Sequence, residues 1–146
     1  MKRVVCNEDY CIGCKLCSVH CITSHSRYKD PVRAFKRQGL SGEERSRLRE
    51  LGHVSVTQRC QHCSDPLCVQ ACLTGALYKD KDGAVLHDEA KCAVCGTCMV
   101  VCPIGGLTRN GGKGLIRKCD LCRDTDEPAC VANCPNGALK VVEESR

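Results

Sequence analysis

Cysteine is the residue type through which this chain can do chemistry, because sixteen of its seventeen cysteines fall into four groups of four. Each group opens with Cys-x2-Cys and closes with a gap of three residues. The middle gap is two residues in the first and third groups, four in the second and seven in the fourth. Thiolates are soft ligands for zinc or iron–sulfur clusters, so this spacing indicates metal binding. The groups are Cys11, Cys14, Cys17, Cys21; Cys60, Cys63, Cys68, Cys72; Cys92, Cys95, Cys98, Cys102; and Cys119, Cys122, Cys130, Cys134.

Two other uses of cysteine fit the spacing less well. Structural zinc sites usually pair two separated Cys-x2-Cys knuckles into a tetrahedron, whereas here a third cysteine follows at once. Disulfides would have to join cysteines only three positions apart, in a chain whose start at 1–6 lacks the apolar run of an export signal. The sequence therefore favours iron–sulfur clusters over zinc and over disulfides.

The third group, Cys-x2-Cys-x2-Cys-x3-Cys followed by Pro103, has the spacing of bacterial ferredoxins that bind two [4Fe–4S] clusters. Three closely spaced thiolates surround one cluster. The fourth lies about one helical turn further on and faces a neighbouring cluster. Groups of this kind bind clusters in pairs by exchanging their last cysteines. Because every group is complete, we expect four [4Fe–4S] clusters and no three-iron cluster.

The elements that position these loops are predicted to be short. A Cys-x-x-Gly-small-Leu pattern follows the closing cysteine of groups two, three and four, which indicates that a two-group unit has been duplicated. Alternating strand patterns occur at 53–57 and 139–142, and hairpin patterns occur at 76–88 and 106–118. The three-residue gaps predict helices of one or two turns. The expected fold is α+β, with two ferredoxin-like two-cluster units packed together around four clusters.

The composition of the chain gives the clusters a structural role. It has 146 residues, which suits a single domain spanning 1–146, but only three Tyr, one Phe and no Trp. Domains of this size normally gain stability by burying large apolar side chains. We therefore expect the clusters to replace part of the core and folding to depend on them.

The chain resembles the four-cluster ferredoxin-like electron-transfer subunits of molybdenum and tungsten oxidoreductases, formate dehydrogenases, hydrogenases and carbon monoxide dehydrogenases. The resemblance rests on Cys-Ile-Gly-Cys-Lys-Leu-Cys-Ser-Val-His-Cys at 11–21 and on Cys-Gln-His-Cys-Ser-Asp-Pro-Leu-Cys-Val-Gln-Ala-Cys-Leu-Thr-Gly-Ala at 60–76. Leu73 stands where the family commonly has proline, a departure expected to alter a helix end rather than ligation.

The resemblance also implies how the groups pair, because in this family the first pairs with the fourth and the second with the third. It divides the chain into two units, 1–21 with 103–146 and 60–102. The sequence by itself also permits neighbouring groups to pair, first with second and third with fourth. The implied ligand sets are Cys11, Cys14, Cys17, Cys134; Cys119, Cys122, Cys130, Cys21; Cys60, Cys63, Cys68, Cys102; and Cys92, Cys95, Cys98, Cys72.

The longest stretch between groups, 22–59, is predicted to be a basic insertion that contributes no ligand. Eight basic and four acidic residues lie within 27–50. Ser41-Gly-Glu-Glu44 matches a capping box, which predicts a helix through Leu51 that ends at Gly52. A solvated helix over a loop and a docking element for a partner both fit this composition.

Several residues adjoin the cysteines. A positive charge next to a ligand favours a raised reduction potential, which is the effect expected of Lys15, Lys91 and Lys118. His20 and His62 are interpreted as partly exposed linker residues, with a hydrogen bond near cluster sulfur as the alternative. Cys6, outside the four groups, is interpreted as a small buried apolar residue of a strand.

The formal net charge of +5 suggests nucleic acid as a partner, but the clusters would change that charge. Each oxidised cluster with four thiolates adds about −2, which brings the loaded chain from +5 to about −3. Aromatic side chains for base stacking are also scarce, so no nucleic-acid partner is expected. No apolar stretch approaches the roughly 18 residues of a membrane span. We therefore expect no direct membrane span and a cytoplasmic location.

The sequence contains no nucleophile–base pair, phosphate-binding glycine loop or dinucleotide fingerprint, so the chain is not expected to be an enzyme on its own. The predicted function is to relay single electrons through four clusters between a catalytic oxidoreductase subunit and an electron donor or acceptor. The resemblance implies that this partner is an aldehyde-oxidoreductase-type tungsten or molybdenum enzyme, a carbon monoxide dehydrogenase, a hydrogenase or a formate dehydrogenase. A free polyferredoxin and a non-redox metal-binding module are the alternatives.

Overall fold

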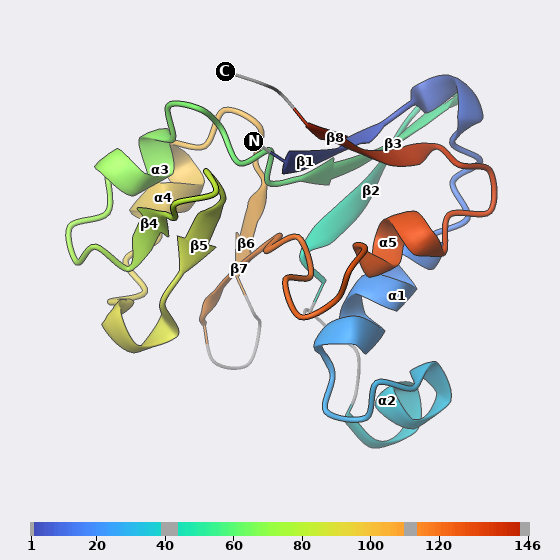
Figure 1. The fold of residues 1–146 in the computed structure, drawn as a ribbon, viewed down its shortest axis with the longest axis horizontal. Coiled ribbons are helices and arrows are strands. Elements are labelled where there is room, and N and C mark those ends of the chain that lie inside the picture. The colour runs from blue at the N-terminus through green and yellow to red at the C-terminus, as the bar shows by residue number, and fades with distance from the viewer. Residues whose placement is uncertain (1, 39–43, 110–113, 144–146) are drawn as a thin grey trace.

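Short strands and short helices follow one another along the chain (Figure 1). The computed structural model describes residues 2–38, 44–109 and 114–143, and within them the expected α+β fold class is confirmed. The strands are β1 Lys2–Cys6, β2 Ser46–Leu51, β3 Val54–Arg59, β4 Leu77–Lys79, β5 Val85–His87, β6 Leu107–Arg109, β7 Ile116–Lys118 and β8 Leu139–Glu143. The helices are α1 Leu16–His25, α2 Pro31–Gln38, α3 Leu67–Gln70, α4 Thr97–Val100 and α5 Ala129–Ala132, with 3₁₀ turns at Glu8–Tyr10 and Glu89–Lys91.

The described strands pair two by two into antiparallel ribbons. β4 pairs with β5 and β6 with β7, so the hairpins expected at 76–88 and 106–118 are confirmed. In the first hairpin Asp80 makes the turn, because its Oδ1 accepts the backbone N–H groups of Asp82 and Ala84. The turn of the second hairpin, which the sequence pattern places at 110–112, lies outside the described residues.

The two ends of the described chain meet in one ribbon, in which β1 pairs with β8 (Figure 1). Val4 lies opposite Val141 there, and Val4 is 1% exposed. This pairing carries the first cysteine group and the fourth to the same side of the molecule. It also confirms the strand predicted at 139–142.

The helices follow the cysteine loops closely. Helices α3, α4 and α5 are four residues long and carry Cys68, Cys98 and Cys130, as the predicted one or two turns require. Helix α1, which carries Cys17 and Cys21, is ten residues long, so the prediction is wrong there: the helix continues past Cys21 to His25. A proline or a left-handed residue precedes each of these four helices, since these conformations end a loop and allow the first helical turn to begin. Helix α1 packs against α5, and α3 packs against α4. Helices of the first and fourth groups therefore meet, as do those of the second and third.

The helix expected from Ser41 to Leu51 is wrong. Residues 46–51 are strand β2, which pairs with β3 so that Leu51 lies opposite Val54 and Arg49 opposite Val56. The β-branched residues of β3 supply a partner strand, and tertiary pairing of this kind outweighs the local helix preference of an Arg- and Glu-rich segment. Gly52, at φ +63°, makes the turn rather than ending a helix. Residues 41–43 lie outside the described part of the chain.

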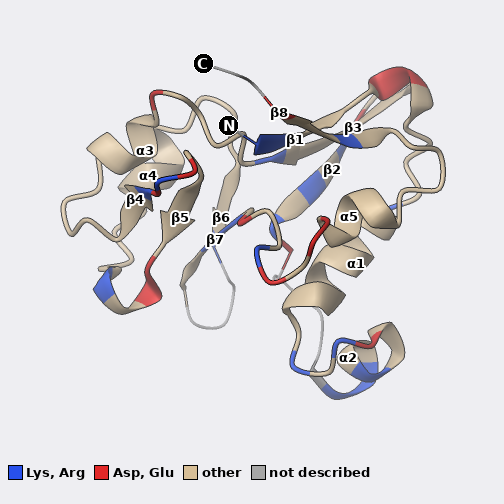
Figure 2. Cartoon of the chain, viewed as in Figure 1, with Lys and Arg blue, Asp and Glu red and all other residues tan. Residues whose placement is uncertain are grey.

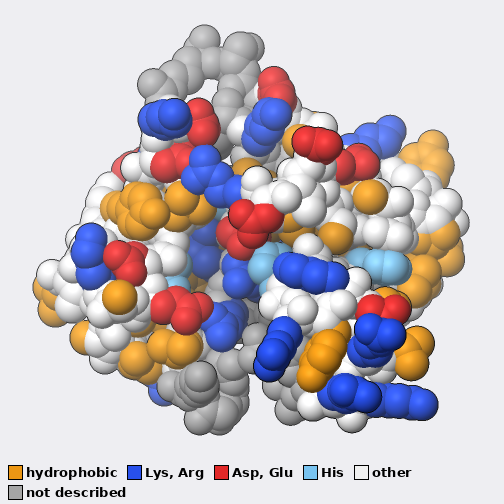
Figure 3. Space-filling model, turned by 60° about the horizontal axis from the view of Figure 1, so that its bottom comes forward, with side chains coloured by type: hydrophobic (Ala, Val, Ile, Leu, Met, Phe, Trp, Pro, Cys, Tyr) orange, Lys and Arg blue, Asp and Glu red, His pale blue; other side chains and the backbone are white. Residues whose placement is uncertain are grey.

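Helix α2 packs against α1 and lies away from β2 and β3 (Figure 1). Its Ala34 is fully buried, whereas Val32 and Phe35 are 60% and 50% exposed. Lys and Arg residues occur along α2 and β2 (Figure 2). On the face that Figure 3 turns forward, Lys and Arg side chains lie beside hydrophobic ones. In the described segments we find no helix both long and apolar enough to cross a lipid bilayer.

Buried apolar side chains form two clusters in the described residues. The first contains Leu77, Val85, Leu107 and Ile116 of β4–β7 together with Cys68 and Cys98. The second contains Val4 and Leu139 of β1 and β8 together with Cys17 and Cys130. Each cluster is small and includes cysteine side chains. The apolar packing is therefore built around the sulfur atoms rather than beside them.

Gly106 shows how tightly one of these loops is packed. It occupies the small position of the repeated Cys-x-x-Gly-small-Leu pattern, where the other two copies have Ala76 and Ala138. A Cβ at Gly106 would lie 2.6 Å from the backbone N of Cys60, a distance that the backbone cannot accommodate without moving. The loop that carries Cys60 therefore requires glycine at this position.

We expect Gly106→Ala to lower the free energy of unfolding of the metal-loaded chain by about 1–3 kcal/mol, because the added methyl displaces the Cys60 backbone. Chemical denaturation followed by circular dichroism measures the change, and bound iron should fall with it. Ala138→Gly, at the matching position, is the control and should cost about 1 kcal/mol without loss of iron. Equal behaviour of the two variants would contradict the packing argument.

Candidate metal centres

Cysteines of the first and fourth groups line one cavity. Cys11, Cys14 and Cys17 contribute from one side and Cys134 from the other, and we call these four residues the Cys11 quartet. Burial raises the pKa of Cys17 to about 11. Burial also raises the pKa of Cys11, and repulsion by Cys134 adds to the shift. The β1–β8 ribbon brings these thiols together, although more than a hundred residues separate them in sequence.

A second cavity, of about 100 Å³, is lined by Cys92, Cys95 and Cys98 of the third group and by Cys72 of the second. We call these the Cys92 quartet. Burial and the neighbouring thiols raise the pKa of Cys98. Burial opposes ionisation of Cys72 as well, but the backbone N–H of Leu77, 3.5 Å from Cys72 Sγ, lowers the pKa of that thiol.

The Cys60 quartet combines the same two groups the other way round. Three of its cysteines come from the second group and one from the third: Cys60, Cys63, Cys68 and Cys102. Burial raises the pKa of Cys68 to about 11, and repulsion by Cys60 and Cys102 adds to it. Burial raises the pKa of Cys63, and the same two thiols contribute. The backbone N–H of Gly106 donates to Cys102 Sγ over 3.4 Å.

The remaining cysteines form the Cys119 quartet, Cys119, Cys122, Cys130 and Cys21. Burial raises the pKa of Cys119 to about 12 and also raises the pKa of Cys122 and Cys130, and repulsion by Cys21 contributes to all three. Cys21 differs from them. Burial opposes its ionisation, but a hydrogen bond with His25 and the charge of Arg45 lower its pKa overall.

Side chains around the Cys119 quartet form one polar network. His25 Nε2 lies 3.0 Å from each carboxylate oxygen of Asp120, and Asp120 also pairs with Arg45. Burial would lower the pKa of His25, but the bond to Asp120 raises it to about 10, so the ring is an imidazolium. Its Nδ1–H then donates to the carbonyl of Cys21 over 2.8 Å. Sequence patterns did not identify His25, because Asp120 lies 95 positions away.

Two basic side chains beside the quartets are almost fully buried. Arg59 is 1% exposed and Lys118 is 4% exposed, and each directly precedes the first cysteine of a group, Cys60 and Cys119. Lys15 and Lys91 also adjoin cysteines in the sequence, yet their side chains are 65% and 64% exposed. Position next to a cysteine therefore did not separate buried cations from solvated ones, and the prediction did not include Arg59, although it directly precedes Cys60.

The prediction of a partly exposed linker residue at His62 is wrong, because this histidine is fully buried. Its Nδ1 accepts the backbone N–H of Val85 over 3.1 Å, so a neutral ring carries its proton on Nε2. Burial, together with the charge of Lys118, lowers the pKa of His62 to about 3. The contact with β5 covers the residue, and a local reading of the sequence could not anticipate it.

Cys6, the cysteine outside the four groups, is half-buried at the end of β1. Its thiol interacts with the Cys11 thiol and contributes, after burial, to the raised pKa of Cys11. Cys6 thus lies next to the Cys11 quartet rather than in the apolar packing alone.

The surroundings of the quartets suit a metal cluster whose sulfur atoms accept hydrogen bonds. Thiols packed this closely repel one another once ionised, and iron bound between them removes that repulsion. In the described residues, Arg59 Nε and His62 Nε2 are buried and have no hydrogen-bond partner. Both are N–H donors, and cluster sulfide or thiolate sulfur is the acceptor that this environment otherwise lacks. The donor sets therefore suit [4Fe–4S] clusters.

These features, a small α+β fold in which cysteine groups distant in sequence come together, are typical of an iron–sulfur protein. Residues 52–144 match the model of the 4Fe-4S dicluster domain, and the chain belongs to this family.

The relatives of the chain have related descriptions. The thiosulfate reductase electron transfer subunit PhsB of Salmonella typhi is 37% identical over 92% of this chain and 71% of its own length. The electron transport protein HydN of Escherichia coli strain K12 is 32% identical over 99% of this chain and 90% of its own length. One subunit of the anaerobic dimethyl sulfoxide reductase of the same strain is 36% identical over 91% of this chain and 69% of its own length.

A solved structure shares the fold as well. A component of the active site complex BamBC of benzoyl coenzyme A reductase, with benzoyl-CoA, superimposes with a TM-score of 0.54 and 26% identity. The match covers 97% of this chain and 79% of that one. The arrangement of short ribbons and cysteine-bearing helices is thus one that a known oxidoreductase complex uses.

We expect removal of iron to unfold the chain, because the two apolar clusters contain few large side chains and are built around cysteine. Chelation under mild oxidation, followed by far-UV circular dichroism and thermal melting, measures the effect. The cooperative transition should disappear and should return after anaerobic reconstitution with iron and sulfide. An iron-free chain that keeps a native spectrum and a cooperative melt would contradict this expectation.

Proposed function

We propose that the chain is the electron-transfer subunit of an oxidoreductase complex and relays single electrons through four [4Fe–4S] clusters. The observation that carries this proposal is that cysteines of the first and fourth groups line one cavity and cysteines of the second and third groups line another. The relatives support it, since they include the electron transfer subunit of a thiosulfate reductase and an electron transport protein. The bound clusters would supply one-electron redox chemistry, while the chain's residues hold them, exclude water and set their surroundings.

In this proposal each quartet holds one cluster. The Cys11 and Cys119 quartets exchange the last cysteines of the first and fourth groups, and the Cys60 and Cys92 quartets exchange those of the second and third. The packing of α1 on α5 and of α3 on α4 supports this pairing. The two apolar clusters support two ferredoxin-like units packed together, one for each pair of groups.

The proposed electron path runs through the quartets in the order Cys11, Cys119, Cys60 and Cys92. Arg59 influences thiols of the first two quartets, and Lys118 influences thiols of the second and third. Cys68 and Cys98 of the third and fourth quartets lie in one apolar cluster. At the two ends, Cys14 and Cys95 are exposed. A path with buried middle members and exposed ends is suited to exchange with two different partners.

The catalytic partner is proposed at the level of class. Thiosulfate reductase and dimethyl sulfoxide reductase appear in the names of relatives, and benzoyl coenzyme A reductase appears in that of a solved neighbour. These names support a reductase or dehydrogenase partner with its own substrate site, and a separate electron donor or acceptor. A tungsten or molybdenum centre in that partner and a cytoplasmic location stay predictions.

The cluster content is directly measurable. Anaerobically purified chain should contain about sixteen iron and sixteen sulfide per polypeptide, because each of four quartets holds one cube. A reductive titration followed by electron paramagnetic resonance should consume about four electrons per chain, one for each cluster. Zinc without sulfide would rule out the proposal in favour of a non-redox metal site.

The subunit role makes a separate prediction. Loaded chain alone should not turn over any oxidoreductase substrate, and purification from native cells without harsh salt should recover it bound to a larger catalytic subunit. Mass spectrometry of the complex identifies that subunit. Recovery of all the loaded chain as a free monomer would favour the polyferredoxin alternative, and substrate oxidation by the monomer would contradict the relay itself.

A further inference from the structure

Arg59, at the end of β3, is a buried cation between two quartets. Its Nη1 lies 3.0 Å from Cys130 Sγ of the Cys119 quartet, and its second amino group bonds to Thr57 Oγ1. Within residues 2–38, 44–109 and 114–143 the structure gives Arg59 no carboxylate partner. Burial raises the pKa of Cys17, and the charge of the Arg59 guanidinium opposes that shift. The charge of Arg59 therefore reaches the Cys11 quartet as well.

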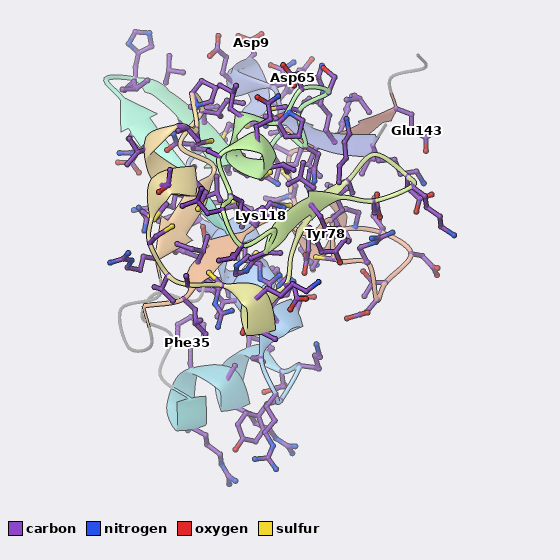
Figure 4. The ribbon with its side chains drawn as sticks, turned by 90° about the vertical axis from the view of Figure 1, so that its left-hand side faces the viewer. Asp9, Phe35, Asp65, Tyr78, Lys118 and Glu143 are labelled. Atoms are coloured by element: carbon purple, nitrogen blue, oxygen red, sulfur yellow. The ribbon has the colours of Figure 1, made fainter. Side chains whose placement is uncertain are left out.

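Lys118, at the end of β7, is the second such cation, and it lies near the centre of the molecule in Figure 4. Its Nζ donates to the backbone carbonyl of Val85 and to that of Cys119, the latter over 2.6 Å. In the described part of the chain Lys118 has no carboxylate partner. The ammonium therefore lies against the Cys119 quartet, and its charge also reaches Cys68 of the Cys60 quartet.

Burying two cations without anionic partners is costly, and it is tolerated only where another negative charge compensates them. Four thiolates around an oxidised cluster carry a net negative charge that increases when the cluster is reduced. The Asp120 carboxylate does not serve this purpose, since it is paired with both Arg45 and His25. The anionic partner of Arg59 and Lys118 is therefore expected at the quartets.

The Cys92 quartet has a different environment. Burial raises the pKa of Cys98, and repulsion by Cys92, Cys95 and Cys72 adds to the shift. Burial opposes ionisation of Cys72, but backbone N–H groups lower its pKa overall, and a hydrogen bond with Thr97 lowers the pKa of Cys95. Lys91, which precedes Cys92, is exposed and pairs with Asp88 over 3.5 Å. Water and the carboxylate screen that charge.

We propose that the buried positive charges of Arg59 and Lys118 make the cluster of the Cys119 quartet the most easily reduced of the four. Both buried cations contact this quartet, Arg59 at Cys130 Sγ and Lys118 at the Cys119 carbonyl, and within the described residues neither donates a hydrogen bond to a cysteine of another quartet. The charges of Lys118 and of the half-buried Arg3 also reach the Cys60 quartet, but without such a contact. One electron from a donor turns a [4Fe–4S]²⁺ cluster into [4Fe–4S]⁺ with no proton or bond change. A buried cation stabilises that added negative charge, so the reduced state gains most where two cations converge.

The inference rests on the proposed function. It means that the first electron occupies the same cluster whichever end of the relay it enters. An electron that enters at either exposed end would settle on the Cys119 quartet, next to the middle of the path. Electrons added afterwards would occupy the clusters with fewer cations.

The test is an electron paramagnetic resonance redox titration of the anaerobically loaded full chain, with dithionite as reductant, for three variants. Arg59→Gln and Lys118→Gln should each lower the reduced-to-oxidised ratio of the highest-potential cluster at least tenfold at fixed potential, a downward shift of about 59 mV or more for one electron. Each variant should also shift one further cluster, and that second cluster should differ between them. Arg59→Lys should restore most of the potential, because it keeps the charge.

Lys91→Gln is the matched control, since Lys91 and Lys118 both precede the first cysteine of a group but differ in burial. It should leave all four potentials nearly unchanged. The inference is overturned if Lys91→Gln and Lys118→Gln act alike, or if the cluster shifted by both cation variants is not the one of highest potential. If Arg59→Gln does not fold, an unshifted highest potential in Lys118→Gln overturns it alone. Iron far below sixteen per wild-type chain would instead refute the proposed function.

Discussion

Repulsion among closely packed thiolates is the constraint on which the rest of the structure depends. Burial raises the pKa of Cys17, Cys68 and Cys119 to 11 or above, so these thiols are not stable as anions by themselves. Metal bound between them removes the penalty and also joins loops that are distant in sequence. The backbone N–H groups of Leu77 and Gly106, directed at cysteine sulfur, serve the same end. Two-stranded ribbons and short helices suffice as scaffold because cysteine side chains take part in the apolar packing.

The buried cations follow from the same constraint. A guanidinium such as that of Arg59, 1% exposed and without a carboxylate in the described chain, is unfavourable unless a negative charge lies close by. Thiolates of the quartets meet that need, and the cations in turn stabilise the thiolates. The Asp120 network adds a balanced group in which one carboxylate is shared by Arg45 and His25. Each buried charge in this interior is thus balanced by its own neighbours, and the net charge of the chain does not predict these local balances.

The sequence predicted what depends on local chemistry. Cysteine spacing indicated the metal chemistry, and Asp80 with its following residues indicated the first hairpin turn, since both signals lie within a few positions. It failed where distant segments decide the outcome. The segment at 46–51 has helical composition but pairs with β3, and His62 is buried because β5 folds over it. Arg59 adjoins Cys60 in the sequence, but its burial and its contact with Cys130 depend on segments 71 positions apart.

The repeated Cys-x-x-Gly-small-Leu pattern supplies equivalent positions, and packing makes them different. The small position of the repeat tolerates alanine at 76 and 138, but at 106 it faces the Cys60 backbone and must be glycine. The position before a group's first cysteine is a solvated lysine at 91 and a buried one at 118. A relay of four identical sites would have no preferred place for an electron. Divergence at positions such as these, rather than any change in the ligands themselves, is what can distinguish one cluster from the next.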